Sequence, residues 1–96
     1  MFDKMKQLME MKKQVDKIKK NLDSSAIEID EVKGISIKIN GSQHFLSLSV
    51  SEDYLTPEAK PKLEKELLRA MNLAVRKSQS VAAEKMKSVM PSIPGL

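Results

Sequence analysis

The sequence predicts an α+β fold, an α-β-β-β-α subunit with a three-stranded antiparallel sheet and two long helices projecting beyond it. Near both ends of the chain apolar residues recur every three or four positions, which is the period of an amphipathic helix. Through the middle they alternate with polar residues, which is the period of a half-buried strand. A chain of 96 residues accommodates one domain. We expect it to cover residues 1–90, with residues 91–96 as a flexible tail.

Residues 3–22 are predicted to form the first helix. Its apolar stripe alternates spacings of three and four, as in a short coiled-coil seam, and consists of Leu8, Met11, Val15, Ile18 and Leu22. Met5 and Met9 widen this stripe, which suits a core or a dimer seam, or an adaptable protein-binding surface. Turn-forming residues over 21–25 end the helix.

Residues 26–51 contain three predicted strands. Their apolar positions alternate with polar ones and are Ile27 and Ile29, then Ile35, Ile37 and Ile39, then Leu46, Leu48 and Val50. We expect each strand to have one buried face and one solvated face.

The two connections between these strands also carry signals. A two-residue loop at 33–34 would place the first pair of isoleucines on the face opposite to Ile35. A three-residue loop over 32–34 pairs position 29 with 37 and puts all the isoleucines on one face, with Gly34 in the left-handed conformation. We therefore predict the three-residue loop. Asn40-Gly41 predicts a type I′ hairpin turn, because both residues tolerate positive φ.

The last helix is predicted to begin near Pro61, after a short turn at Pro57, and to end before Pro91. Its stripe at helical spacing consists of Leu63, Leu67, Met71, Ala74, Ser78, Val81 and Ala82. Helices of this length are longer than the strands, so they must overhang the sheet.

Few aromatic residues are available for the core, namely Phe2, Phe45 and Tyr54. Small folds with such cores often need the support of a second copy, so we expect a homodimer. The residues expected in the core or at the dimer seam are Leu8, Met11, Val15, Ile18, Ile35, Ile37, Leu46, Leu48, Leu67 and Met71.

Charge is segregated along the chain. Residues 1–22 carry seven lysines and three acidic residues, residues 23–60 carry three lysines and seven acidic residues, and residues 61–90 again carry seven cations and three acidic residues. Two basic ends around an acidic middle favour a polyanionic partner. A lysine-rich helix face is usually only a solvated surface, which is the plainer alternative.

Several stretches of the sequence together carry a family resemblance, namely the central strand and turn at 34–41, the pair Tyr54-Leu55, the last helix at 63–74 and the opening Met1-Phe2. In these stretches the chain resembles the YbaB/EbfC family of nucleoid-associated DNA-binding proteins. Family members often have two glycines before the central strand and an Asp-Pro after the third, whereas this chain has one glycine there and Ser51-Glu52. The resemblance implies a bacterial dimer whose helices project as tweezer-like arms and bind DNA.

We therefore expect a cytoplasmic, nucleoid-associated protein that binds double-stranded DNA with little sequence specificity and affects nucleoid organisation and gene expression. Lysine and arginine suit phosphate, because each contact releases condensed counterions. The candidate DNA-binding residues lie on both helices and are Lys4, Lys6, Lys12, Lys13, Lys17, Lys19, Lys20, Arg69, Arg76, Lys77, Lys85 and Lys87. The alternative is a protein-interaction adaptor that uses its coiled-coil-like helices.

We expect no enzyme activity, no small-molecule substrate, no cofactor and no metal. His44 is the single histidine, cysteine is absent, and the sequence has no phosphate-binding loop and no nucleophile motif. The first residues lack an apolar signal core, and no apolar run approaches the length of a membrane span. We therefore expect no membrane partner.

Overall fold

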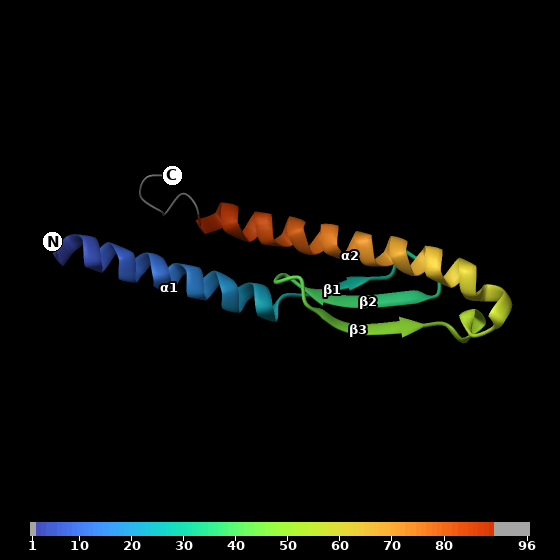
Figure 1. The fold of residues 1–96 in the computed structure, drawn as a ribbon. Helices are drawn as coiled ribbons and strands as arrows, with labels where there is room; N and C mark the ends of the chain where they lie inside the picture. Colours follow the sequence, from blue (N-terminus) through green and yellow to red (C-terminus); the bar gives the residue numbers. More distant parts are fainter. Residues whose placement is uncertain (1, 90–96) are drawn as a thin grey trace.

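The computed structural model describes residues 2–89, so the tail expected at 91–96 lies outside the described residues. In chain order the elements are α1 (Phe2–Ser24), β1 (Ala26–Ile29), β2 (Ile35–Asn40), β3 (Phe45–Val50), two short 3-10 turns (Glu52–Tyr54 and Pro57–Ala59) and α2 (Lys60–Val89). The strands form one antiparallel sheet in the order β1-β2-β3 (Figure 1). The predicted α-β-β-β-α architecture of the α+β class is confirmed.

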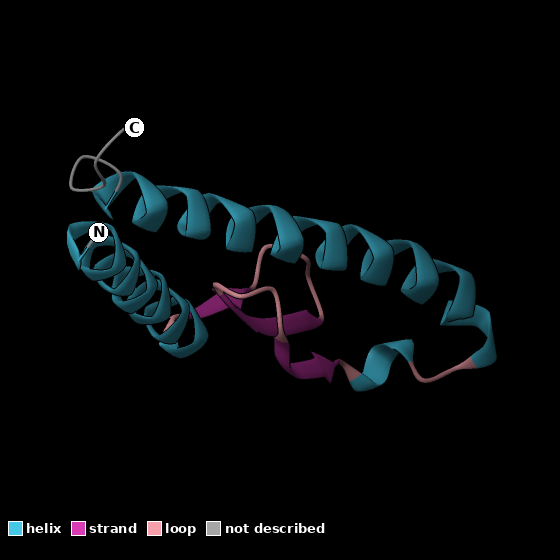
Figure 2. Cartoon of the chain, turned by 60° about the vertical axis from the view of Figure 1, so that its left-hand side comes forward, coloured by secondary structure: helices cyan, strands magenta, loops and turns pink. Residues whose placement is uncertain are grey.

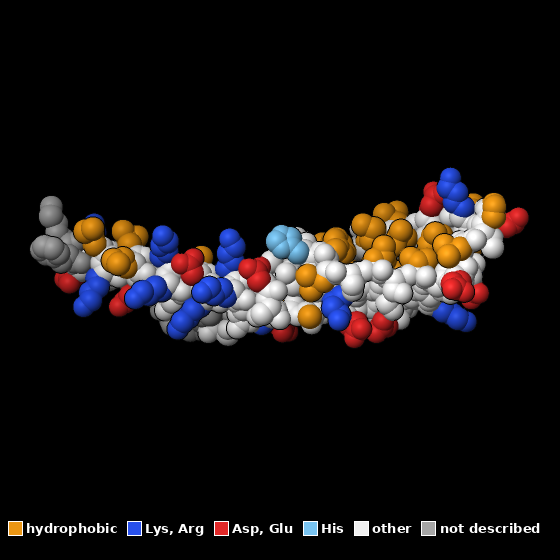
Figure 3. Space-filling model, turned by 90° about the horizontal axis from the view of Figure 1, so that it is seen from below, with side chains coloured by type: hydrophobic (Ala, Val, Ile, Leu, Met, Phe, Trp, Pro, Cys, Tyr) orange, Lys and Arg blue, Asp and Glu red, His pale blue; other side chains and the backbone are white. Residues whose placement is uncertain are grey.

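The molecule is elongated, with principal extents of 67 × 18 × 16 Å. One part of α2 lies along a face of the sheet, and its C-terminal part continues beyond the sheet on the side where α1 projects (Figures 1 and 2). Both helices therefore overhang the sheet, as their lengths predict. Basic side chains are spread over the α1 end of the molecule (Figure 3).

The register of β1 and β2 confirms the three-residue loop. Ile29 lies opposite Ile37, and Ile27 lies opposite Ile39. Gly34 has a φ of 84°, in the left-handed region that glycine favours. The ring of Tyr54 also packs closely against Gly34. A Cβ at this position would lie only 2.7 Å from Tyr54 Cε2, so a larger residue would collide with the ring.

The turn between β2 and β3 differs from the predicted type I′ turn. Four residues, 41–44, connect the strands, and it is Gln43 that has a positive φ, of 64°. The side chain of Asn40 organises this turn, because its Oδ1 accepts hydrogen bonds from the backbone N–H groups of Ser42 (3.0 Å) and His44 (2.9 Å). The prediction of a type I′ turn was wrong. Asn40 is the last residue of β2 and its side chain is buried, so Asn40 does not occupy a central position of the turn.

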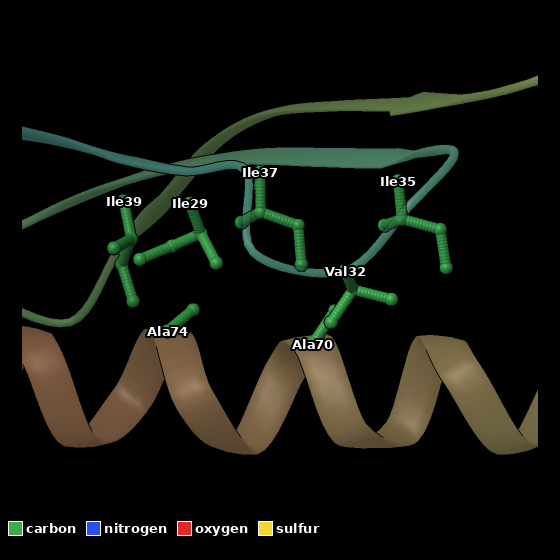
Figure 4. Packing of buried hydrophobic residues seen from close by; sticks show 7 residues of the cluster. All are labelled: Ile29, Val32, Ile35, Ile37, Ile39, Ala70 and Ala74. Carbon is green, nitrogen blue, oxygen red and sulfur yellow. The ribbon is translucent and has the colours of Figure 1, made fainter.

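The core lies between α2 and the two strands β1 and β2. Its members are Ile29, Val32, Ile35, Ile37, Ile39, Ala70 and Ala74 (Figure 4). The two alanines of α2 are fully buried, and their small side chains let the helix backbone approach the isoleucines closely. Isoleucine therefore supplies most of the buried volume of this small core.

The third strand lacks the buried face that its alternating pattern predicts. Leu46 is 51% exposed and Leu48 is 56% exposed, although Leu48 lies opposite the buried Ile37. The reason is the position of α2, which packs against β1 and β2. A β-bulge adds a second difference, because Lys38 pairs with Ser47 whereas Ile39 pairs with Phe45.

Candidate nucleic-acid interface

The basic side chains of α1 form the first part of the candidate interface, and all of them are exposed. They are Lys4, Lys6, Lys12, Lys13, Lys17, Lys19 and Lys20. Within residues 2–89, ion pairs join Lys60 to Glu64, Arg69 to Glu66 and Lys77 to Glu31, so none of them involves α1. The seven ammonium groups of α1 are therefore free to meet an external anion.

The cations of α2 fall into two groups. Arg76 and Lys87 are exposed and form no ion pair with the rest of the described chain. Arg69 lies 3.3 Å from the Glu66 carboxylate, Lys77 binds Glu31, and Lys85 donates to Asn21 and Ser25 at the end of α1. Of the predicted contacts on this helix, three therefore already have partners inside the molecule.

The contact between Lys77 and Glu31 links α2 to the β1–β2 loop. The hydrogen bond from the Lys77 ammonium is the largest influence on Glu31 and holds the pKa of that carboxyl below its ordinary value. The Glu31 carboxylate thus stays ionised and paired through the neutral range. Both side chains are partly exposed, at 40% for Lys77 and 48% for Glu31, so water weakens the attraction between them.

The C-terminal end of α1 is docked onto the β2–β3 turn. Gly41 N–H donates to the carbonyl oxygen of Leu22 (2.9 Å) and to that of Ser25 (3.1 Å), and Asn40 Nδ2 donates to the Asp23 carbonyl oxygen (3.2 Å). A Cβ at Gly41 would lie 3.2 Å from both Cα and O of Leu22, so glycine is needed there for close approach. We call this contact the α1 joint.

A shallow apolar groove of about 250 Å³ lies between β3 and α2, which we call the β3 groove. Its apolar lining consists of Ile37, Phe45, Leu46, Leu48 and Met71. Phe45 is 47% exposed and Met71 is 41% exposed, so this lining faces solvent in the single chain. Figure 3 shows hydrophobic side chains gathered over the part of the molecule that holds the sheet.

The residues expected in the core or at a dimer seam separate by exposure. Ile35 and Ile37 are buried, and Ile18 and Leu67 are half-buried. The exposed members lie either on α1 or around the β3 groove and are Leu8, Met11, Val15, Leu46, Leu48 and Met71. Within the described part of the chain, these six residues therefore leave two apolar surfaces uncovered, the α1 stripe and the β3 groove.

Sequence reasoning missed the polar residues that hold α1 to the body. Ser78 is fully buried, and its Oγ donates to the Asn40 carbonyl oxygen over 2.7 Å, while the Asn40 side chain is itself buried. The sequence did offer a signal for this contact, since Ser78 stands inside the apolar stripe of the last helix. A hydroxyl that is buried there needs a hydrogen-bond partner.

No group of three or more potential metal ligands lies together within residues 2–89. No helix described there is long and apolar enough to cross a bilayer.

The fold and the exposed lysines define a class, that of small α+β proteins with a basic projecting helix suited to a polyanionic ligand. The model of the YbaB/EbfC DNA-binding family matches residues 1–93, and the chain belongs to this family. A nucleoid-associated protein of Chloroflexus aurantiacus is 30% identical over 93 residues, which cover 96% of this chain and 93% of that protein. Nucleoid-associated proteins of Syntrophobacter fumaroxidans (29%, covering 99% and 89%) and Alkaliphilus metalliredigens (27%, covering 100% and 87%) are also similar.

Proposed function

We propose that this chain is a nucleoid-associated protein that binds double-stranded DNA as a homodimer, with little sequence preference. Its place of action is the nucleoid in the cytoplasm, and its effects on nucleoid organisation and gene expression follow from coating DNA. Membership of a DNA-binding family and the names of the relatives support this proposal. The observation that carries it is the set of seven exposed α1 lysines, which have no acidic partner within residues 2–89.

Phosphate contacts supply most of the proposed affinity. The α1 lysines lie on a helix that projects beyond the sheet, so a duplex that binds along α1 contacts them away from the acidic middle of the chain (Figure 1). Arg76 and Lys87 of α2 add cations that have no ion pair within residues 2–89. Because phosphates are present at every step of a duplex, such contacts carry little sequence information.

Double-stranded DNA suits this surface better than a single strand. Proteins that bind single strands stack bases on aromatic side chains, and this chain has one Tyr, two Phe and no Trp. The sequence also carries no helix-turn-helix, zinc-finger or RNA-recognition signature, which favours weak or broad specificity.

The homodimer that we propose uses the β3 groove. The helix side of the sheet is covered over β1 and β2, and the uncovered β3 leaves room beside α2 for another apolar element. Residues 45–51 carry no charge, so no ammonium or carboxylate would be desolvated when a partner covers the strand. A second copy presents the same apolar side chains, among them Leu46, Leu48 and Met71. Two such surfaces can therefore pack against each other in a two-fold dimer.

The proposed function is tested by fluorescence anisotropy titrations of labelled duplexes of three unrelated sequences, at 50 and 200 mM salt. With six to eight phosphate contacts, affinity should fall about a thousandfold or more between these concentrations. The three duplexes should bind alike and a single strand more weakly. Binding that is independent of salt, or that occurs on one duplex alone, would contradict the proposal.

A protein-interaction adaptor is the second candidate function. It is favoured by the exposed apolar stripe of α1, where Leu8 is 65% exposed, Met9 is 63% exposed and Val15 is 57% exposed. An adaptor would bury this stripe against another protein and would show no salt-dependent affinity for duplexes. The anisotropy titration therefore separates the two functions.

A further inference from the structure

The position of α1 depends on few contacts outside its C-terminal end. α1 packs chiefly against α2 and β2. The groove between α1 and α2 is lined by Gln14, Lys17, Ile18 and Asn21 of α1 and by Lys85 and Ser88 of α2. The N-terminal half of α1, which carries Lys4, Lys6 and Lys12, lies beyond these contacts. Its direction in space is therefore set by the α1 joint together with the contacts between the C-terminal half of α1 and α2.

A chain of hydrogen bonds runs through the joint from α2 to α1. Ser78 of α2 donates to the Asn40 carbonyl oxygen, and the Asn40 side chain donates to the carbonyl oxygen of Asp23. Ser42 Oγ adds a hydrogen bond to the Asp23 carboxylate, and Gly41 N–H caps the carbonyl of Leu22. The last turn of α1 is thus attached to the β2–β3 turn, which is itself attached to α2.

Lys85 makes the only direct polar link between α2 and α1 found in residues 2–89. Its ammonium donates to Asn21 Oδ1 and to Ser25 Oγ, and Ser25 Oγ in turn donates to the Asn21 carbonyl oxygen over 2.7 Å. These groups lie at the C-terminal end of α1, where the helix dipole is negative and favours a cation. Two of the three N–H donors of the ammonium are therefore engaged with acceptors inside the chain.

We propose that Lys85 is a positioning residue that fixes the angle between α1 and α2, and is not itself a phosphate contact. The inference rests on the proposed function only for its effect on DNA affinity. With Lys85 in place the α1 lysines are presented in one orientation. Without it α1 samples several orientations, and the affinity is the affinity of the productive orientation multiplied by the fraction of time that α1 spends in it.

The angle is measured first without DNA. The chain has no cysteine, so Glu10→Cys on α1 and Gln79→Cys on α2, both at exposed positions, introduce a single pair of spin labels. Labelled chains are mixed with an excess of unlabelled chains, so that only distances within one subunit contribute. We expect Lys85→Met to broaden the distance distribution obtained by pulsed electron paramagnetic resonance. The control Lys87→Met, at an exposed position two residues away, should leave the distribution unchanged.

Binding then distinguishes positioning from phosphate contact. If α1 is productively oriented about one tenth of the time, Lys85→Met weakens binding about tenfold with an unchanged slope of log affinity against log salt. Loss of a phosphate contact, which we expect for Lys87→Met, lowers the slope by about 1. A Lys85→Met variant with a lowered slope and a narrow distance distribution would overturn the proposal.

Two further outcomes are decided by the same measurements. If circular dichroism shows that Lys85→Met is unfolded, Asn21→Ala removes one acceptor of the same ammonium and should broaden the distribution likewise. A narrow distribution in that variant would overturn the proposal. If the wild-type chain fails to bind duplexes, the proposed function fails, while the distance distribution still decides whether Lys85 positions α1.

Discussion

Leu48 lies directly opposite Ile37 in the β2–β3 ladder, yet Leu48 is 56% exposed and Ile37 is 2% exposed. Residues opposite each other in an antiparallel pair project from the same face of the sheet. Their environments differ because α2 covers β2 and leaves β3 uncovered. This half-covered face is the main reason to expect that the folded chain associates with a second copy.

Replacing Leu48 with Asp should break the proposed dimer. A carboxylate buried without a partner costs about 3 kcal/mol or more, which corresponds to a dissociation constant raised at least about a hundredfold. Sedimentation velocity at micromolar protein measures this as a shift toward the mass of one chain, 10.8 kDa. Ser49→Asp is the matched control, because Ser49 lies opposite Ser36 on the solvated face. A Leu48→Asp variant that sediments like the wild type would contradict the assignment of the β3 groove.

Changing Lys12, Lys13 and Lys17 together to Glu should weaken binding to every duplex alike. Three phosphate contacts are lost and three repulsive carboxylates are added, so the loss should exceed about a hundredfold at moderate salt. The control Lys33, Lys38 and Lys60 to Glu makes the same change in net charge outside α1. An equal loss in both variants would mean that net charge, not the position of α1, governs binding. A triple α1 variant that binds like the wild type would favour the adaptor.

Gly34→Val should destabilise the fold by about 2 kcal/mol or more. A β-branched residue resists the φ of 84° found there, and its Cβ would collide with the ring of Tyr54. Urea denaturation followed by circular dichroism measures the change in the free energy of unfolding. The same substitution in a Tyr54→Ala background should cost less, and the difference isolates the contact with the ring from the backbone strain. A fully stable Gly34→Val chain would exclude both causes.

The ion pair between Lys77 and Glu31 predicts a pH dependence of stability. Lys77 lowers the pKa of Glu31 from its ordinary value of 4.5, so this pair stabilises the folded chain above that pH and loses its effect as pH falls through the lowered pKa. Lys77→Met should therefore cost stability at pH 7 and progressively less toward pH 3. Thermal unfolding at several pH values tests this, with Arg76→Met as the unpaired control. A loss that stays constant down to pH 3 would contradict the role of Glu31.

The fold was predictable because each element follows from a local pattern. The register of β1 and β2 followed from the requirement that Ile29 and Ile37 share a face, which the three-residue loop satisfies and the two-residue loop does not. The β2–β3 turn was not predictable in the same way. Asn40 and Gly41 are committed to contacts with α1, and nothing in the local sequence indicates those contacts.

The candidate site was predictable in composition but not in detail. The α1 lysines are exposed as a lysine-rich helix face predicts. Lys77 and Lys85 belong to the same basic pattern, yet their partners Glu31 and Asn21 lie 46 and 64 positions away in the chain. Only the packing of α2 against the other elements brings these groups together. The number of charges in a segment therefore does not distinguish cations that face solvent from cations that bind partners within the fold.

The length of α1 sets a scale for coverage of a DNA lattice. Its 23 residues extend about 34 Å at 1.5 Å per residue, which is close to one turn of the duplex. If α1 lies along the axis of the DNA that we propose as its ligand, one such helix occupies about ten base pairs. In that orientation a shorter duplex leaves part of its lysines without phosphates, and a long duplex holds at most about one hundred such helices per thousand base pairs along one face.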